Sequence, residues 1–197
     1  MSSLVGLTGS IGMGKSTTLK LFCEEGCDTW DADAAVHRLY EKSAEAAAAI
    51  GTLYPRAIVD GKVSRKILRE IVISIPESLQ RIERIVHPLV VRDREQFQQS
   101  SLSDVAVLEI PLLFETGGER KMDVTVCVTV KEDIRRKRVL SRRGMTEERF
   151  RTLRENQLSD MEKRERSDFV IVTDTIEHAR RQVQLVLRCV RERAGYA

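Results

Sequence analysis

Near its start the chain reads Gly9-Ser10-Ile11-Gly12-Met13-Gly14-Lys15-Ser16, the pattern G-x-x-x-x-G-K-S/T of a phosphate-binding loop. Glycines let consecutive backbone N–H groups turn inward around an anion, where a Cβ would obstruct the turn. The lysine of this pattern reaches the β- and γ-phosphates, and the serine hydroxyl ligates Mg²⁺. We therefore expect the phosphates of a nucleotide to bind Gly9, Gly12, Met13, Gly14, Lys15, Ser16 and Thr17.

The residues on either side of this loop have the context that the motif requires. Residues 4–8 form a short apolar run, and residues 17–25 carry apolar side chains at helical spacing. Gly26 suits the C-terminal cap of that helix. A strand, a loop and a helix in this order predict a nucleoside triphosphate site rather than a glycine-rich turn.

Composition limits the class of protein. The 197 residues suffice for one compact α/β domain with a small insertion, but not for two full domains. No stretch approaches the roughly 18 apolar residues of a membrane span, and the start lacks the apolar core of a signal peptide. We expect a cytoplasmic protein with no membrane partner. The four cysteines lack the spacing of a zinc site, so reduced thiols are favoured.

The net charge of +3 is distributed unevenly, because basic residues outnumber acidic ones between Lys131 and Arg166. Such a block is typical of a nucleic-acid patch, of a solvated helix face, or of arginines gathered around phosphates. The phosphate-binding loop favours the third interpretation, so we expect no nucleic-acid partner.

Five strands separated by helical segments predict a parallel, doubly wound sheet. The expected strands are residues 4–8, 27–30, 104–110, 124–130 and 169–172. Helical patterns cover residues 34–40, 43–51, 64–69 and 176–193, and a helix near Pro76 is expected to break at Pro88 and resume to about Gln99. Almost nothing between residues 34 and 100 has strand character.

This pattern predicts an organisation in three parts within one compact unit. Residues 1–33, 104–140 and 167–197 form the core, and residues 141–166 form a lid. Residues 34–103 form a helical insertion, which is expected to bind the compound that accepts a phosphate from the nucleotide. We expect a monomer or a weak homo-oligomer.

Two other nucleotide-binding classes fit the residues less well. A dinucleotide-binding dehydrogenase has glycines in the order G-x-G-x-x-G, whereas the order here is G-x-x-G-x-G. A GTP-dependent switch normally carries Asn-Lys-x-Asp for guanine, and no such tetrapeptide occurs. The helical insertion and the arginine-rich segment instead favour a small phosphoryl-transfer kinase.

Several further stretches resemble the dephospho-CoA kinase family, and they occur in the family's order along residues 4 to about 172. They are Leu7 to Ser16, Asp31-Ala32-Asp33, Gly61 to Leu68, Ile85 to Val90, Ile110 to Glu115, Arg142 to Met145, and Asn156-Gln157. The resemblance implies a P-loop kinase that uses ATP and Mg²⁺ to phosphorylate the 3′-hydroxyl of dephospho-CoA, the last step of coenzyme A synthesis. The alternatives are another nucleoside monophosphate or small-molecule kinase and, more remotely, a GTP-binding switch.

Three acidic residues are candidates for the site, and two of them have a second, structural interpretation. We assign Asp33 to accepting or orienting the proton of the acceptor hydroxyl, because the resemblance favours this role over an N-cap for a helix that begins at Ala34. Asp31 either holds Mg²⁺ through water or caps the helix. Glu109 stands where the family frequently has Asp, and its longer side chain is expected to reach the water shell of the magnesium.

The basic candidates are weighed in the same way. Arg143, with Arg142 as a close rival, is assigned to the transferred phosphate, because a guanidinium donates bidentately to phosphate oxygens. Taken singly, each is more typical of a solvated or ion-paired helix residue, but the clustering of the pair around Gly144, which marks the turn of the lid, favours the phosphate role. Arg65 and His87 are substrate-site candidates through the resemblance, against a surface arginine and a structural histidine.

Overall fold

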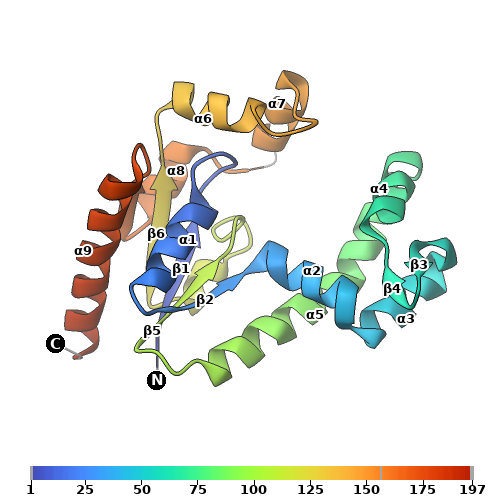
Figure 1. Ribbon diagram of the computed structural model, residues 1–197, viewed down its shortest axis with the longest axis horizontal. Coiled ribbons are helices and arrows are strands. Elements are labelled where there is room, and N and C mark those ends of the chain that lie inside the picture. Colours follow the sequence, from blue (N-terminus) through green and yellow to red (C-terminus); the bar gives the residue numbers. More distant parts are fainter. Residues whose placement is uncertain (1, 156, 196–197) are drawn as a thin grey trace. The chain divides into compact units, whose positions relative to one another are not determined.

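The computed structural model describes residues 2–155 and 157–195, which divide into two compact units (Figure 1). One unit contains the residues up to Asp31 and those from Ser101 onward, and is called the core unit here. The other is Ala32–Ser100, called the helical unit. The helical unit begins two residues before the expected insertion and ends three residues before it does.

The core unit is built on a five-stranded sheet with the order β2-β5-β1-β6-β7, and every neighbouring pair is parallel. The strands are β1 (Ser3–Thr8), β2 (Asp28–Asp31), β5 (Val105–Glu109), β6 (Val124–Thr129) and β7 (Phe169–Val172). β5 and β6 are buried along their whole length, as expected for apolar and β-branched runs at the centre of a parallel sheet. The predicted fold is therefore confirmed.

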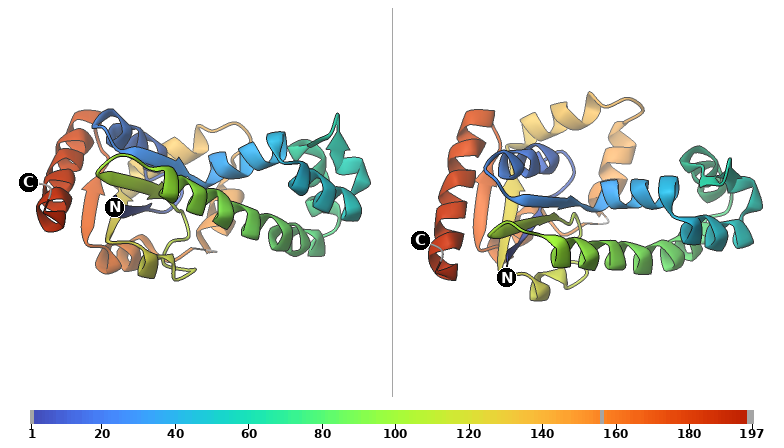
Figure 2. Two further views of the ribbon diagram at one scale, coloured as in Figure 1. Left: turned by 90° about the horizontal axis from the view of Figure 1, so that it is seen from below. Right: turned by 60° about the horizontal axis from the view of Figure 1, so that its bottom comes forward.

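Helices cover both faces of this sheet. On one face α1 (Lys15–Glu24) and α9 (Ile176–Ala194) pack against each other, and their apolar side chains enclose Val5, Leu7 and Val126 in the main apolar cluster. In both views of Figure 2, α9 lies alongside β7. The other face carries α8 (Asp160–Arg166) and the segment after β5, where Leu113 lies so close that a Cβ on Gly6 would meet its Cδ2 at 2.9 Å.

Between β6 and α8 the chain forms α6 (Glu132–Leu140) and α7 (Glu147–Glu155). Arg135 of α6 and Arg154 of α7 both lie over the ring of Phe150, 5.1 and 5.6 Å from its centroid. Glu132 forms ion pairs with the same two arginines. These contacts hold α6 and α7 together by charge and cation–π attraction rather than by a large apolar interface.

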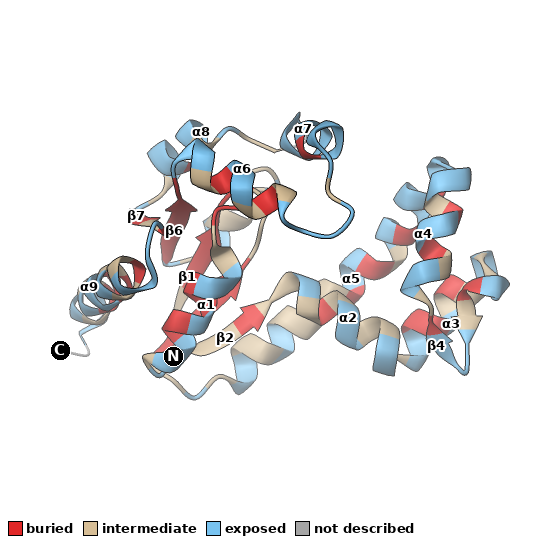
Figure 3. Cartoon of the chain, turned by 45° about the horizontal axis from the view of Figure 1, so that its top comes forward, coloured by how far each residue is buried: buried red, intermediate tan, exposed pale blue. Residues whose placement is uncertain are grey.

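The helical unit has an apolar cluster of its own. It contains α2 (Ala32–Lys42), α3 (Ala44–Leu53), the short helix η1 (Pro55–Ala57), α4 (Arg65–Ser74) and α5 (Glu77–Ser100). Ser43 and Ser64 cap α3 and α4 through their hydroxyls. Most of the buried residues, coloured red in Figure 3, lie on α3, α4 and α5, and they include Ile50, Ile71 and Ile82.

Three predictions for the helical unit differ from the structure. A short antiparallel hairpin, β3 (Ile58–Val59) with β4 (Lys62–Val63), surrounds the predicted turn, where Asp60 and Gly61 have φ values of 51° and 73°. α5 continues through Pro88 without the predicted break, because the apolar face on either side of the proline is buried and offsets the lost hydrogen bond. α2 begins at Ala32, so Asp33 lies inside its first turn and is not an N-cap.

Within the described part of the chain, no helix is both long enough and apolar enough to span a membrane.

Candidate active site

The phosphate-binding loop connects β1 to α1 and is closely packed. Gly12 and Gly14 have φ values of 82° and 95°, in the left-handed region that favours glycine. A Cβ on Gly12 would lie 2.5 Å from Val139 Cγ2, and one on Gly14 would lie 2.9 Å from Thr173 Oγ1. Both glycines are therefore required by backbone conformation and by space, which explains this part of the motif.

Side chains from α6 and from the end of β7 hold the shape of the loop. Thr173 Oγ1 donates a hydrogen bond to the Met13 carbonyl at 2.7 Å, and Arg138 donates to the Thr173 carbonyl at 2.6 Å. The buried Arg135 donates from Nε to the Ile11 carbonyl at 3.0 Å. With its carbonyls held from outside, the loop is pre-organised to turn its N–H groups toward an anion.

The N-terminus of α1 adds a positive end to this site. Lys15 is its first residue, and Lys15 Nζ donates to the Gly9 carbonyl at 2.9 Å, across the mouth of the loop. Ser16 and Thr17 are exposed in the first turn, which contains no acidic residue. The partial positive charge of the helix start and the lysine ammonium together favour bound phosphate.

Two carboxylates end neighbouring strands at the same edge of the sheet as the loop. Asp31 is the last residue of β2 and Glu109 the last of β5, and the two are register partners. Glu109 is also paired in register with Leu7, near the end of β1. Because parallel strands end at one edge, both carboxylates belong to the edge where the loop begins. Carboxylate oxygens are the ligands that Mg²⁺ prefers.

The two candidate lid arginines lie in an exposed turn after α6. Gly144 has a φ of 76° and makes this turn. Among the described residues, no hydrogen bond or ion pair involves the guanidinium of Arg142 or Arg143. Arg142 lies two residues past the end of α6, whose residues Arg135 and Val139 both contact the loop region.

The remaining candidates lie in the helical unit. Asp33 is in the first turn of α2, Arg65 is the first residue of α4, and His87 lies in α5; all three are exposed on that unit. Asn156, which carries part of the family resemblance, lies outside the described residues. The structure thus brings together the loop, Asp31 and Glu109 within the core unit.

Sequence reasoning did not assign roles to Arg135, Arg138 or Thr173, which support the loop. Arg135 and Arg138 were considered only as part of a basic segment. Their three-residue spacing is a signal of a common helix face, which Arg136 does not share.

Comparisons with known proteins bear on the family of this chain. A family model described as dephospho-CoA kinase matches residues 3–178. A relative from Ruegeria pomeroyi named dephospho-CoA kinase is 52% identical over 191 residues, which cover 97% of each chain. The crystal structure of TT1252 from Thermus thermophilus has 31% identity and a TM-score of 0.81, covering 95% of this chain and 97% of that one. Dephospho-CoA kinase from Campylobacter jejuni shares the fold, with 23% identity, a TM-score of 0.69, and coverage of 96% and 97%.

The match over nearly the whole length, together with the loop and the strand-end carboxylates, places this chain in the dephospho-CoA kinase family.

Proposed function

We propose that this protein transfers the γ-phosphoryl group of ATP to the 3′-hydroxyl of dephospho-CoA, giving coenzyme A and ADP. The observation that carries the proposal is a pre-organised phosphate loop in a chain that matches the family model over residues 3–178. Phosphoryl transfer leaves little covalent chemistry to the protein, so the residues act mainly by positioning and by stabilising charge.

In this proposal the donor phosphates bind the core unit. The N–H groups from Gly12 to Thr17 surround the β-phosphate, and Lys15 leaves the Gly9 carbonyl to meet the β- and γ-phosphates. Because Lys15 already reaches across the loop at 2.9 Å, a small rotation of its side chain suffices.

The donor set at the strand ends fits Mg²⁺. Ser16 supplies a hydroxyl, and Asp31 and Glu109 supply carboxylates through bound water. The described residues contain no cluster of three or more His, Cys, Asp or Glu that would bind a metal alone. A site with one or two carboxylates, completed by water and substrate phosphates, is typical of Mg²⁺ in kinases. Bound there, Mg²⁺ would neutralise charge on the β- and γ-oxygens.

We assign the acceptor side of the reaction to the helical unit and to the turn after α6. Asp33 takes or orients the proton of the 3′-hydroxyl, and Arg65 and His87 contact the acceptor. Arg143, with Arg142 as its rival, neutralises the transferred phosphoryl group from the lid, residues 141–166. Within the described part of the chain these exposed guanidinium groups make no hydrogen bond or ion pair, so they are available to a ligand, which supports the assignment.

A screen of acceptors tests the proposed reaction. ADP release is measured with ATP or GTP as donor and with dephospho-CoA, nucleoside monophosphates and other small hydroxyl compounds as acceptors. We expect rapid release only with ATP, dephospho-CoA and Mg²⁺ together, and loss of that release in EDTA. ADP release with a different acceptor, and none with dephospho-CoA, would show that the assignment of dephospho-CoA is wrong, although the protein would still be a kinase. Tight GTP binding without acceptor-dependent turnover would instead indicate a switch.

A further inference from the structure

Within the core unit, a buried lysine on α8 holds this helix to the segment after β5. Lys163 has no solvent exposure. Its Nζ donates to the Pro111 carbonyl at 2.7 Å and lies 2.9 Å from Glu115 Oε1. Thr8, the last residue of β1, donates to the same Pro111 carbonyl at 3.2 Å. The lysine therefore connects α8, the segment after β5, and the strand end from which the phosphate loop begins.

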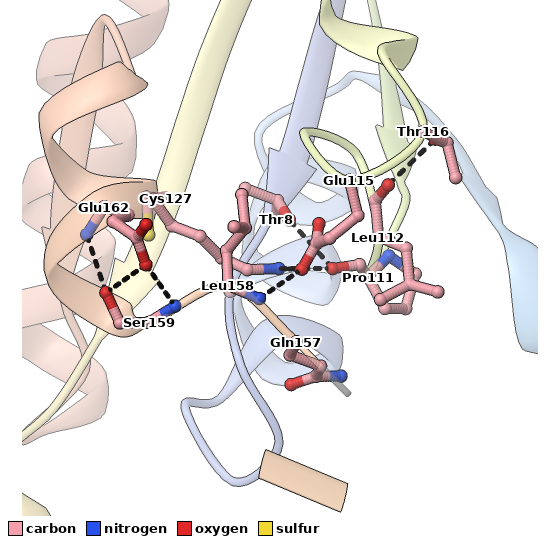
Figure 4. Close-up of polar contacts among 12 residues, drawn as sticks. Thr8, Pro111, Leu112, Glu115, Thr116, Cys127, Gln157, Leu158, Ser159 and Glu162 are labelled. Carbon is pink, nitrogen blue, oxygen red and sulfur yellow. Dashed lines mark hydrogen bonds and ion pairs between the residues drawn. The ribbon is translucent and has the colours of Figure 1, made fainter. Parts of the chain in front are cut away.

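Glu115 also contacts the segment that follows α7. Its Oε1 accepts a hydrogen bond from the Leu158 N–H at 2.9 Å (Figure 4). The neighbouring Gln157 in turn accepts, at its Oε1, a hydrogen bond from the Ile11 N–H of the phosphate loop at 3.3 Å. A continuous series of contacts thus runs from Lys163 through Glu115 and the 157–158 backbone to the loop.

Residues from outside the loop hold both the backbone N–H and the backbone carbonyl of Ile11. Gln157 accepts from its N–H, and Arg135 donates to its carbonyl. Ile11 directly precedes Gly12, where the proposed cradle of N–H groups begins. A shift of the 157–158 backbone therefore changes the orientation of the Ser10–Ile11 peptide, which directly precedes the first cradle peptide, and misplacements of about 1 Å reduce turnover strongly.

Burying a lysine and a carboxylate costs more than burying an apolar pair of the same volume. An apolar pair would hold α8 to the segment after β5, but it would offer no acceptor to the Leu158 N–H. The largely buried Glu115, 17% exposed, supplies that acceptor at a defined position, and Lys163 fixes where its carboxylate lies.

We propose that Glu115, held by Lys163, is a positioning residue for phosphoryl transfer. It fixes the backbone at Leu158, so that Gln157 keeps the Ser10–Ile11 peptide of the phosphate loop in its binding orientation. The effect on catalysis rests on the function proposed above, whereas the effect on the loop does not.

Two variants of Glu115 separate this role from simple charge compensation. Glu115→Gln keeps the length of the side chain and an acceptor oxygen for Leu158, but removes the charge beside Lys163. Glu115→Asp keeps the charge and withdraws the acceptor by one methylene. A positioning role makes Glu115→Asp the more harmful variant for the loop, whereas a purely electrostatic role makes it the milder one.

The chain offers a matched control on the same two elements. Arg166 of α8 pairs with Glu119 after β5 at 2.6 Å, and this pair makes no contact with residues 157–158 among the described residues. The double variant Arg166→Met, Glu119→Gln removes an α8 ion pair without touching the proposed series. Gln157→Ala is a second test that leaves Lys163 and Glu115 intact if the Glu115 variants fold poorly.

The experiment measures amide hydrogen exchange by NMR in the nucleotide-free protein, together with kcat and KM. In Glu115→Asp we expect faster exchange at both Leu158 and Ile11, and a kcat lower by about 10- to 100-fold with a smaller change in KM for ATP. Gln157→Ala should accelerate exchange at Ile11 alone and lower kcat similarly. Glu115→Gln and the control pair should keep both amides protected and kcat within about threefold of the parent.

Different failures have different meanings. Exchange that rises at Leu158 but not at Ile11 would overturn the relay, and so would a Glu115→Gln variant more impaired than Glu115→Asp. If exchange changes as expected while no variant or parent turns over dephospho-CoA, the proposed reaction fails and the relay to the loop stands.

Discussion

The core unit and the helical unit use polar side chains in different ways. In the core unit the buried Arg135, the half-buried Arg138 and the buried Thr173 are committed to backbone groups around the phosphate loop. The helical unit has its ion pairs on the surface, as in Arg92 with Glu45 at 2.6 Å, and its fold rests on an apolar cluster. The core unit therefore shapes its ligand site with its own polar contacts, whereas the helical unit presents its candidate residues on a scaffold that rests mainly on apolar packing.

The largest effect is expected where a core-unit side chain is free of such contacts. Arg143→Ala should lower kcat by about 1000-fold, because it removes a charge that stabilises the transferred phosphoryl group. ATP affinity and the melting temperature should change little, since no hydrogen bond or ion pair with a described residue holds that exposed guanidinium. Steady-state kinetics, nucleotide titration and thermal unfolding check the three quantities.

Arg142→Ala is measured in parallel, because Arg142 lies in the same exposed turn as Arg143. A large loss in Arg142→Ala with normal turnover in Arg143→Ala would transfer the role to Arg142. Arg151→Ala, an exposed arginine of α7, serves as the control and should retain parental turnover. Parental turnover in all three variants would show that neither Arg142 nor Arg143 takes part in the mechanism.

The apolar scaffold of the helical unit is tested by Ile71→Ala. Ile71 is 1% exposed within the cluster of that unit, so the truncation should lower the free energy of unfolding by about 3 kcal/mol. Ile73→Ala on the same helix, where the side chain is 76% exposed, should change it by less than about 0.5 kcal/mol. Urea denaturation gives both values. A small change for Ile71→Ala would show that packing does not dominate this unit.

A polar cluster in the core unit provides the contrasting case. The Asp28 carboxylate accepts hydrogen bonds from the Ser103 N–H, the Ser101 hydroxyl and the Leu102 N–H. These donors, led by the Ser103 N–H, hold the pKa of Asp28 below its ordinary value. A lowered carboxyl pKa stabilises the fold above the pKa of the unfolded chain, and the benefit disappears as the pH falls through the folded-state pKa.

Asp28→Asn should therefore lower the melting temperature at pH 7 by about 2–4 °C, after allowance for solvent screening. The difference from the parent should narrow as the pH is lowered from about 5 toward 3. Glu165→Gln, a substitution at an exposed acidic residue, is the control and should follow the parent. A difference that stays constant with pH would mean that the charge of Asp28 makes no contribution.

The sequence predicted those parts of the fold that local chemistry determines. The runs at 105–109 and 124–129, and the glycines of the loop, require a buried parallel sheet and a phosphate turn whatever surrounds them. The predicted break at Pro88 is wrong, because the helix-breaking tendency of proline is a local property. The burial of the apolar face that keeps α5 helical there depends on tertiary packing. The hairpin at Ile58–Val63 was missed because strands of two residues have no periodicity to detect.

The candidate site shows the same division. Lys15 and Ser16 follow from the motif, but the support from Arg138 and Thr173 depends on bringing together α6 and the end of β7. Glu115 and Lys163 lie 48 positions apart in the sequence and meet only in the folded core unit. No spacing rule relates such residues, so their roles become visible only in three dimensions.

The smallest effect on the free energy of unfolding is expected for the surface ion pairs of the helical unit. Arg92 and Glu45 are 55% and 62% exposed, so water and salt screen their attraction despite a 2.6 Å contact. The double variant Arg92→Met, Glu45→Gln should change the free energy of unfolding by less than about 0.5 kcal/mol, with a coupling energy no larger. A double-mutant cycle by urea denaturation at low and high salt measures this coupling. A coupling above about 1.5 kcal/mol that persists at high salt would mean that polar contacts stabilise the helical unit as they shape the loop of the core unit.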